Sequence, residues 1–388
     1  MENEKKRRHA SFKGFLVHVR LRSFSFIKKN VVMVIALCLA TITCFIVKPD
    51  KEYLGYFDFK TLTCLFCTLA CVCALKNIRF FRIIAEKIIL YFKTVRGAVI
   101  ALVYITFIGS MVIANDMALI TFLPLGYRVL KFTDNKKYMA FTFIMQNIAA
   151  NLGGMLTPFG NPQNLYLYSY FHIGNIEFMK IMLLPFIVSI TLITLCCFKI
   201  PNKEMHYEKE FDVKLSFWRV TLYILLFALS ILIVFRTVPY YIGLVIIPVS
   251  IFLLDRKAMK MVDYPLLLTF VAFFVFAGNM ARIPAVAEFL GGLIEKNTLL
   301  YGTLSCQLIS NVPSAILLSK FTIDYPSLLV AVNIGGAGTL IASLASLITF
   351  KEYLRRSGGK AWGYIKQFSL YNFGILGILL VLMSFVLK

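Results

Sequence analysis

A single carboxylate lies deep in an apolar part of the chain. Asp116 falls within residues 97–127, whereas the other acidic residues occupy loops, surface helices or helix ends. A charged side chain at the centre of a membrane helix costs about 2.5–3.5 kcal/mol, so it is a functional-site hypothesis by default. With Asn115 beside it, Asp116 indicates proton or cation coupling, or an ordering contact to unwound backbone. The structural alternative is a carboxylate that caps the following helix by accepting its free N–H groups.

Residues 151–164, NLGGMLTPFGNPQN, are the most specific local signal. Their glycines, prolines and polar side chains cannot continue a helix that faces lipid, so we expect two half-helices with an unwound connection. Pro162 suits the first turn of the second half-helix, whose free N–H groups could hold an anion. Unwound carbonyls and side-chain oxygens could instead hold Na⁺, and the bland alternative is a kink kept for packing. The candidate ligands are Asn151, Gly153, Gly154, Thr157, Gly160, Asn161, Pro162 and Asn164.

A weaker copy of this stretch follows in the second half, at residues 333–346, NIGGAGTLIASLAS. Aligning Asn151 with Asn333 pairs two glycines, one threonine and one leucine in each half. Irregular backbone at two equivalent places argues against a mere packing kink, because such backbone must be buried in protein or line a cavity. The candidate ligands of the second half are Ser310, Asn311, Asn333, Gly335, Gly336, Thr339, Ser343 and Ser346.

The elements that must position these residues also occur twice. Membrane spans are predicted at about 31–47, 59–75, 178–198, 220–235, 240–254, 265–278 and 368–387; interfacial helices at 78–93 and 281–296; re-entrant hairpins at 97–127 and 298–319; broken helices at 138–171 and 325–350. An odd number of crossings between equivalent elements predicts inverted repeats, which with broken helices are typical of secondary transporters. We therefore divide the chain into an N-terminal segment, a first half, a linker and a second half, at residues 1–30, 31–198, 199–219 and 220–388.

Composition places the chain among membrane proteins. Of 388 residues, 59% are apolar and 15% are charged, and the mean hydropathy is +0.79. This predicts an all-α polytopic membrane protein and excludes a soluble enzyme, a disordered chain and a disulfide scaffold. Cys64, Cys67 and Cys71 share a helix stripe that could suit a soft metal, but cysteine is a common buried small residue. The four histidines lie at ends or in loops, so we expect no catalytic constellation, no enzyme and no cofactor.

The net charge of +22 reflects topology in our interpretation, and we expect no nucleic-acid partner. Of the 41 lysines and arginines, 32 fall in six segments that face the same side if the N-terminus is cytoplasmic and both hairpins are re-entrant. Cytoplasmic loops carry the excess of basic residues. We therefore expect a multi-pass protein of the plasma (inner) membrane with a cytoplasmic N-terminus and the lipid bilayer as its surroundings.

Four motifs resemble the ion transporter superfamily, which includes arsenite permeases, divalent anion/sodium symporters and NhaD-type antiporters. They are ANDMALITFLPL, NLGGMLTPFGNPQN, QLISNVPSAILL and NIGGAGTLIASLAS. The chain is most similar to YbiR-type permeases with a citrate-transporter-like domain. The resemblance covers about residues 30–388. It implies a homodimeric scaffold and a mobile transport part built from both hairpins and both broken helices, which moves as an elevator.

In the symporters each hairpin tip shares a sodium site with the adjacent broken helix, and the substrate lies between the two. By resemblance, Na⁺ would bind at Asn115/Asn161 and at Asn311/Ser343. The tips depart from the symporters' Ser-Asn-Thr pattern, since they read Ala-Asn-Asp and Ser-Asn-Val here. The Asn-Asp tip is more similar to the arsenite permease and antiporter branches, which favours proton coupling.

These observations predict an ion-coupled secondary transporter of a small anion, either citrate or dicarboxylate-like or an oxyanion, driven by H⁺ or Na⁺. The alternative within transport is a Na⁺/H⁺ antiporter of the NhaD type that uses Asp116. A non-transporting receptor or a membrane enzyme is the alternative from another class. The sequence has no catalytic constellation for an enzyme and no output domain for a receptor.

Overall fold

The computed structural model describes residues 30–207, 215–359 and 361–387. The N-terminal segment 1–29 and part of the predicted linker lie outside the described residues. Within the described part, the secondary structure is helical apart from a β-bridge between Thr94 and Glu204. Six helices there are long and apolar enough to cross a membrane: α3 (Phe59–Asn77), α5 (Val95–Ile113), α9 (Asn175–Cys197), α10 (Phe217–Val234), α13 (Tyr264–Ala281) and α19 (Ala361–Val386).

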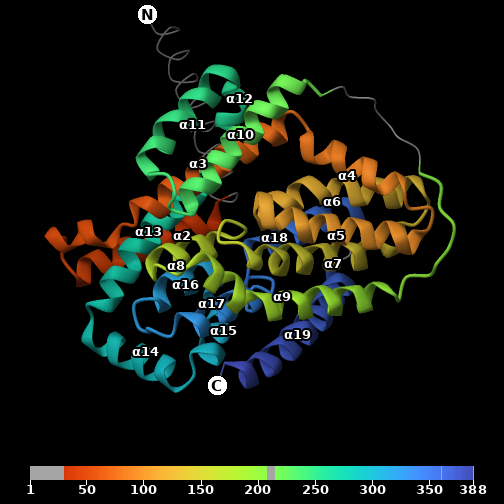
Figure 1. Cartoon of the computed structure of the whole chain (residues 1–388). Helices are drawn as coiled ribbons and strands as arrows, with labels where there is room; N and C mark the ends of the chain where they lie inside the picture. Colours follow the sequence, from red (N-terminus) through yellow and green to blue (C-terminus); the bar gives the residue numbers. More distant parts are fainter. Residues whose placement is uncertain (1–29, 208–214, 360, 388) are drawn as a thin grey trace, which may run out of the picture.

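One group of helices packs mainly among itself. Helix α2 (Val31–Ile46) packs against α13, and α3 packs against α10 and against α11 (Tyr240–Leu254). The short helix α12 (Arg256–Lys260) joins α11 to α13. These helices lie together on one side of the molecule, as Figure 1 shows. We call α2, α3 and α10–α13 the frame.

The two predicted hairpins are pairs of helices that meet at a sharp turn. Helix α5 meets α6 (Asn115–Phe132) at Ala114, and α15 (Thr298–Ile309) meets α16 (Asn311–Leu318) at Ser310. Both turn residues adopt a left-handed φ, 62° at Ala114 and 76° at Ser310. The α5–α6 helices are longer than the predicted 97–127, with 19 and 18 residues, because the basic residues that interrupt the apolar run do not end the α6 helix.

Each broken helix is interrupted where the sequence indicated. Helix α7 (Met139–Gly153) continues into the 3-10 turn η3 (Gly154–Leu156) before α8 (Pro162–Tyr170) begins. In the second half, nine residues lie between the end of α17 (Tyr325–Ile334) and the start of α18 (Leu344–Ser357). Helices α7 and α8 pack against α18 and α17, respectively, so the two breaks face each other. We call the two hairpins and the two broken helices together the core unit.

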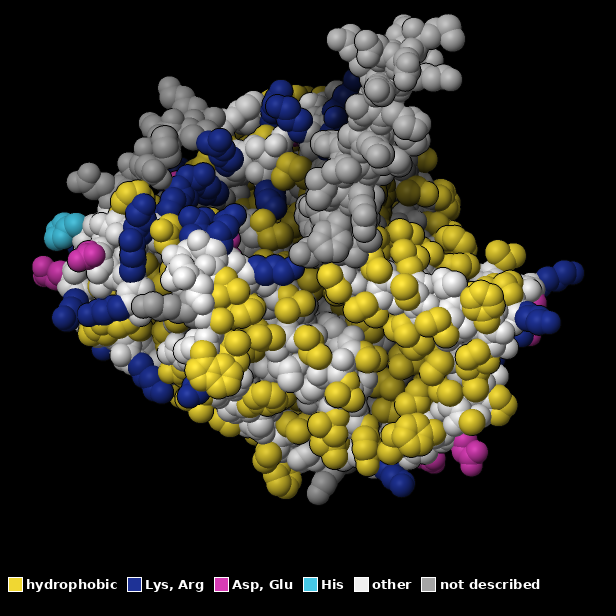
Figure 2. Space-filling view, turned by 180° about the vertical axis from the view of Figure 1, so that it is seen from behind, with side chains coloured by type: hydrophobic (Ala, Val, Ile, Leu, Met, Phe, Trp, Pro, Cys, Tyr) yellow, Lys and Arg dark blue, Asp and Glu magenta, His cyan; other side chains and the backbone are white. Residues whose placement is uncertain are grey.

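Side-chain contacts identify two opposite ends of the helix bundle. At the first end, Asn77 Nδ2 donates to Asp255 Oδ2 at 2.7 Å and Arg356 stacks over Tyr127. At the second end, Arg236 Nη2 donates to the Tyr168 carbonyl at 2.6 Å. The hairpin α5–α6 opens at the first end, and α15–α16 opens at the second, where Lys320 lies over Tyr170. Lysines and arginines gather in one region of the view in Figure 2, while apolar side chains cover much of the rest.

Two shorter helices lie between the frame and the hairpins. They are α4 (Phe80–Leu90) and α14 (Pro284–Lys296), near the predicted interfacial positions. Helix α4 keeps the apolar side chains of Ile84 and Ile88 exposed and buries Ala85 and Ile89. A helix with this pattern suits the boundary between lipid and water.

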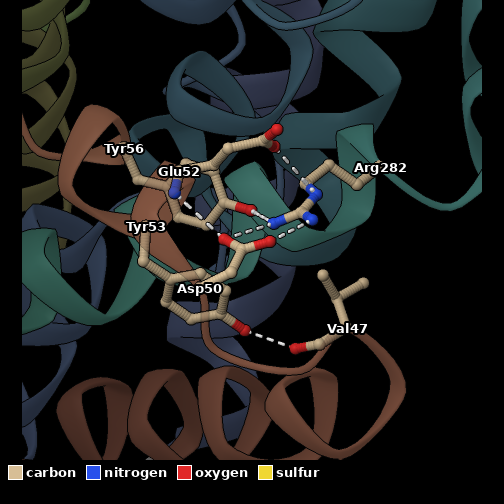
Figure 3. A network of polar contacts seen from close by, with 6 residues as sticks. All are labelled: Val47, Asp50, Glu52, Tyr53, Tyr56 and Arg282. Carbon is tan, nitrogen blue, oxygen red and sulfur yellow. Dashed lines mark hydrogen bonds and ion pairs between the residues drawn. The ribbon is translucent and has the colours of Figure 1, made fainter.

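At the second end of the frame, Arg282 joins α13 to the turn that follows α2 (Figure 3). Its Nη1 donates to Asp50 Oδ1 and to the Tyr56 hydroxyl, both at 3.0 Å, and its Nε lies 3.3 Å from Glu52 Oε2. Hydrogen bonding to Arg282 is the largest cause that lowers the pKa of Asp50 below its usual value. Networks of this kind stabilise more than isolated surface pairs.

We expect Arg282→Gln to lower the apparent melting temperature of the purified protein by a few degrees. Asp50, Glu52 and Tyr56 would all lose the guanidinium group that contacts them. Asp50→Asn should do the same, and the double variant should lose less than the sum of both. Because the pKa of Asp50 is lowered, its contribution is present above the ordinary pKa of an aspartate and is lost as the pH falls through the lowered value. The measurement is thermal unfolding of each variant at several pH values. Lys296→Gln, an exposed change of the same charge at this end, is the control; equal shifts in the control and in Arg282→Gln would contradict the role of the network.

Candidate functional site

A small cavity lies between the two hairpin tips and the frame. Its volume is about 50 Å³, enough for more than one water molecule and far below the roughly 300–1,000 Å³ of common ligand pockets. The core unit lines it from four places, the two hairpin tips, the first residue of α8 and the first residue of α18, and the frame lines it from α2 and α13. The lining residues are Val32, Asn115, Asp116, Pro162, Leu266, Thr269, Ser310, Asn311, Val312, Pro313 and Leu344.

The two tips share one backbone design. In the first, Asn115 Oδ1 accepts a hydrogen bond from the Asp116 N–H at 2.9 Å. In the second, Asn311 Oδ1 accepts one from the Val312 N–H, also at 2.9 Å. Each asparagine is the first residue of its helix, and its side chain bonds the N–H of the residue that follows. No side-chain hydrogen bond caps the start of α6 in the described part of the chain, so Asp116 does not make the capping contact considered above.

Asp116 is left without such a contact. Its Oδ1 atom is buried and has no hydrogen-bond partner within the described residues. Asp116 is also the only ionisable residue among those that line the cavity. An unsatisfied buried carboxylate oxygen is costly, so a proton, a cation or water would stabilise it there.

Four asparagines connect the two broken helices. Asn333 Nδ2 donates to Asn164 Oδ1 at 2.6 Å, and Asn161 Nδ2 donates to Asn333 Oδ1 at 3.2 Å. Asn161 Nδ2 also lies 3.3 Å from the Asn151 carbonyl, while Asn151 Oδ1 accepts from Asn115 Nδ2 at 3.3 Å. The amides thus form a continuous chain from the first tip to the break in the second half.

Asn164 also satisfies the unwound backbone of its own half. Its Nδ2 lies 3.2–3.3 Å from the carbonyl oxygens of Gly154, Met155 and Thr157. Carbonyls freed by a break need such donors, since lipid supplies none. Asn161 Oδ1 remains buried without a partner in the described part of the chain, which makes it a second oxygen that a cation could use.

Corresponding threonines tie each break to its hairpin. Thr157 Oγ1 donates to the Met111 carbonyl at 2.9 Å, and Thr339 Oγ1 donates to the Gln307 carbonyl at 3.2 Å. Each carbonyl lies four residues before its tip asparagine. The aligned threonines therefore make the same contact in both halves.

The aligned glycines allow the hairpin arms to approach the breaks closely. A Cβ atom at Gly153 would lie 2.2 Å from the Phe107 carbonyl oxygen and 2.6 Å from Ser110 Oγ. At Gly335 it would lie 2.9 Å from Cys306. Either substitution would push the arm away, so both glycines are needed for this close packing. Gly154 and Gly160 approach each other in the first connection, and Gly336 lies beside Asn311 Nδ2.

The second tip is tied to the backbone that precedes α18. The Asn311 N–H donates to the Ala342 carbonyl at 2.9 Å, and Ser310 Oγ donates to the same carbonyl at 3.3 Å. Ser343 accepts from the Ser346 N–H at 3.2 Å and caps α18. The serines thus hold the start of this helix, next to the cavity.

Three polar residues missed by the sequence analysis belong to this arrangement. Asn147 Nδ2 donates to Ser346 Oγ at 3.3 Å, and Thr349 Oγ1 donates to Asn147 Oδ1 at 3.4 Å. Gln307 Nε2 donates to the carbonyls of Gly335 at 2.8 Å and Ala337 at 3.1 Å. Asn147 and Gln307 each lie four residues before an identified asparagine, and that spacing was the available signal.

Within each of the two residue pairs suggested for Na⁺, the structure links the two residues only through a third residue. Asn115 and Asn161 both contact Asn151, while Asn311 is bonded to the residue before Ser343. No group of three or more His, Cys, Asp or Glu side chains suitable for a metal occurs within the described residues. Cys64, Cys67 and Cys71 are free, buried thiols.

Comparisons with known proteins identify the family of the chain. Residues 22–326 match the citrate transporter family, CitMHS. The uncharacterized transporter MJ0456 of Methanocaldococcus jannaschii is 33% identical over 309 residues, which cover 79% of this chain and 84% of that protein. The inner membrane protein YbiR of Escherichia coli is 31% identical over 320 residues, which cover 79% and 83%, respectively. The protein is therefore a multi-pass membrane transporter, not an enzyme, and it belongs to the citrate transporter family.

Proposed function

We propose that the protein is a secondary active transporter that moves a small anion, citrate- or dicarboxylate-like or an oxyanion, in exchange with or together with H⁺ or Na⁺. The observation that carries this proposal is the cavity where both hairpin tips and the first residues of α8 and α18 face the frame. Helix starts present a positive dipole end, which can attract an anion without a lysine or arginine. The match to the citrate transporter family supports the anion class.

The two halves are inverted repeats in this proposal. Support comes from the equal turn geometry at Ala114 and Ser310, from the threonine contacts that recur in both halves, and from hairpins that open at opposite ends. Inverted repeats with broken helices place a binding site between two access directions. The basic first end is cytoplasmic in this proposal, because cytoplasmic loops carry the excess of lysine and arginine.

The proposed movement is of the elevator type, with the core unit sliding along a frame that forms a homodimer. The two halves of the core unit contact the frame through different kinds of helix, a broken helix in the first half and a hairpin arm in the second. This difference supports a movable interface. Helix α3 packs against α8, and α13 packs against α16. Exchanging the roles of the two halves would instead bring α3 to α6 and α13 to α18. Sedimentation in detergent would test the dimer.

The coupling ion is assigned to Asp116 in the first tip. A buried carboxylate oxygen without a partner binds a proton or a cation favourably, and either would cancel its charge during the movement. This same observation favours the second candidate function, a Na⁺/H⁺ antiporter of the NhaD type, in which the ions themselves are the cargo. The small size of the cavity also favours an ion with water over a bulky anion in this conformation.

Uptake into proteoliposomes distinguishes the two functions. Citrate, dicarboxylates, arsenite and Na⁺ would each be offered under imposed pH and Na⁺ gradients. Anion uptake that depends on either gradient supports the first proposal. Sodium flux driven only by a proton gradient, with no anion uptake, would replace it with the antiporter.

We expect Asp116→Asn to abolish gradient-driven transport while the protein still inserts and purifies as a folded molecule, because the amide cannot exchange a proton and binds cations weakly. Transport at several pH values and Na⁺ concentrations is the measurement. Asp134→Asn makes the same chemical change at an exposed position and should transport as the unmodified protein does. Unchanged pH or Na⁺ dependence in Asp116→Asn would remove Asp116 from coupling.

We expect Asn115→Ala and Asn311→Ala each to raise the apparent KM for the ion or the anion by roughly tenfold, since losing one hydrogen bond to a buried partner costs about 1–3 kcal/mol. Binding isotherms and initial rates provide the measurement. Asn202→Ala, at an exposed position, is the matched control. Isotherms that match the unmodified protein for both tip variants would show that the tips do not bind ligand.

We expect a cross-link between the frame and the second tip to stop transport. Thr269 on α13 and Val312 on α16 both line the cavity, so cysteines at these positions can be bridged by a reducible bifunctional maleimide. Cysteines at Ser305 and Ser314, whose hydroxyls are 2.8 Å apart within one hairpin, form the control pair. Both pairs need the exposed Cys38 replaced by serine. Full transport after bridging 269 to 312 would contradict the elevator movement.

A further inference from the structure

A basic groove lies at the first end of the bundle, apart from the cavity at the tips. Its volume is about 360 Å³, and it lies where α3 ends, α4 begins and α6 passes. Four cationic side chains line it: Lys76, Arg79, Arg82 and Arg128. This number of cations around one groove points to an anionic ligand.

Two of the four cations are held in place by a buried carboxylate. Glu86 Oε1 accepts from Arg82 Nε at 3.0 Å and from Arg128 Nη2 at 2.9 Å, and Glu86 is only 7% exposed. Arg82, which is fixed through its Nε atom, still has other N–H donors that it can turn toward a ligand. The pair therefore preorganises the wall formed by α4 and α6.

The other two cations have no carboxylate partner within the described residues. Lys76 Nζ contacts Met117 Sδ at 3.7 Å, a weak acceptor. Arg79 is exposed and occupies a left-handed backbone conformation, φ 64°, at the reversal between α3 and α4. Lys76 and Arg79, which lie at this reversal, therefore both line the groove.

The rest of the groove is mainly apolar and continues onto exposed apolar side chains. Ile120 on α6 is 43% exposed, and Phe81, Thr121 and Pro124 complete the lining. Pro124 lacks an N–H, so the Ile120 carbonyl has no donor from its own helix and can accept from a hydroxyl or amine. On α4 the neighbouring Ile84 and Ile88 are also exposed. An apolar rim contributes nothing to the binding of a soluble anion, whereas it can contact the acyl chains of a lipid.

We propose that this groove binds the phosphate headgroup of an anionic membrane phospholipid, with Lys76, Arg79, Arg82 and Arg128 around the phosphate and the acyl chains along the exposed isoleucines of α4 and α6. Basic pockets between membrane helices suit such headgroups. The lipid would bridge the frame, through α3, to the hairpin arm that carries Asp116. This assignment does not rest on the proposed transport function.

Native mass spectrometry of the full chain in neutral detergent tests the site with phosphatidylglycerol as the probe. Each basic side chain at a membrane surface adds about a factor of five to the binding of an anionic lipid, so Lys76→Gln with Arg79→Gln should raise the Kd of the first phosphatidylglycerol by about 30-fold. The control is Lys87→Gln with Lys93→Gln, which removes the same charge from exposed positions outside the groove. Its Kd should stay within about twofold of the unmodified value, because the charge acts locally.

Three outcomes would overturn the proposal. They are equal Kd values for phosphatidylglycerol and phosphatidylcholine, equal losses in the two double variants, and displacement of the lipid by millimolar glycerol phosphate, which would indicate a site for a soluble phosphate compound. If the first double variant cannot be purified, Arg79→Glu alone is used, since Arg79 is exposed. Phosphatidylglycerol should raise the melting temperature of the unmodified protein by mass action and should raise it less in Arg79→Glu; equal increases in both would contradict the assignment.

Discussion

Backbone hydrogen bonding inside the membrane is the constraint on which this structure depends. Two helices stop within the bundle, at Gly153 and Ile334, and lipid cannot satisfy the groups that they leave free. The chain supplies donors for them itself. Asn164 bonds three carbonyls of the first break, and Gln307 bonds two carbonyls of the second. The freed carbonyls of both breaks are therefore hydrogen-bonded within the protein. Buried polar atoms that still lack a partner are exceptions to this pattern.

The same amides connect the two halves. Asn333 bonds Asn164, and Asn161 bonds Asn333, so each break holds the other in register. Apolar contact alone would fix this register weakly, because lipid tails solvate apolar side chains as well as other helices do. Buried amides have few alternative partners at this depth. The polar network thus favours a core unit that keeps its internal arrangement. Apolar contacts, such as that of Tyr166 with Phe274, join this unit to the frame.

Much of this was predictable from residue type and spacing. Glycine, proline and asparagine clusters located both breaks, and the turns came within one residue of the asparagine tips, because few residue types tolerate those backbones at membrane depth. Helix ends were harder to place. Arg128 and Lys131 marked the end of an apolar run but not of α6, since long basic side chains reach water from inside a helix end. The amide partners were not predictable, because contacts such as that of Asn147 with Ser346 join residues about 200 positions apart and depend on how the halves pack.

The halves agree in backbone and differ in charge. Asn115 and Asn311 make the same contact to the next residue, but that residue is Asp116 in one half and Val312 in the other. A second carboxylate at position 312 would share a cavity of about 50 Å³ with the first. Two like charges so close cannot both ionise, so one would stay protonated and add nothing to coupling. In the proposed transporter the shared backbone of the two tips therefore allows the cavity to open to either side of the membrane. The single carboxylate, Asp116, limits this cavity to one change of charge in each transport cycle.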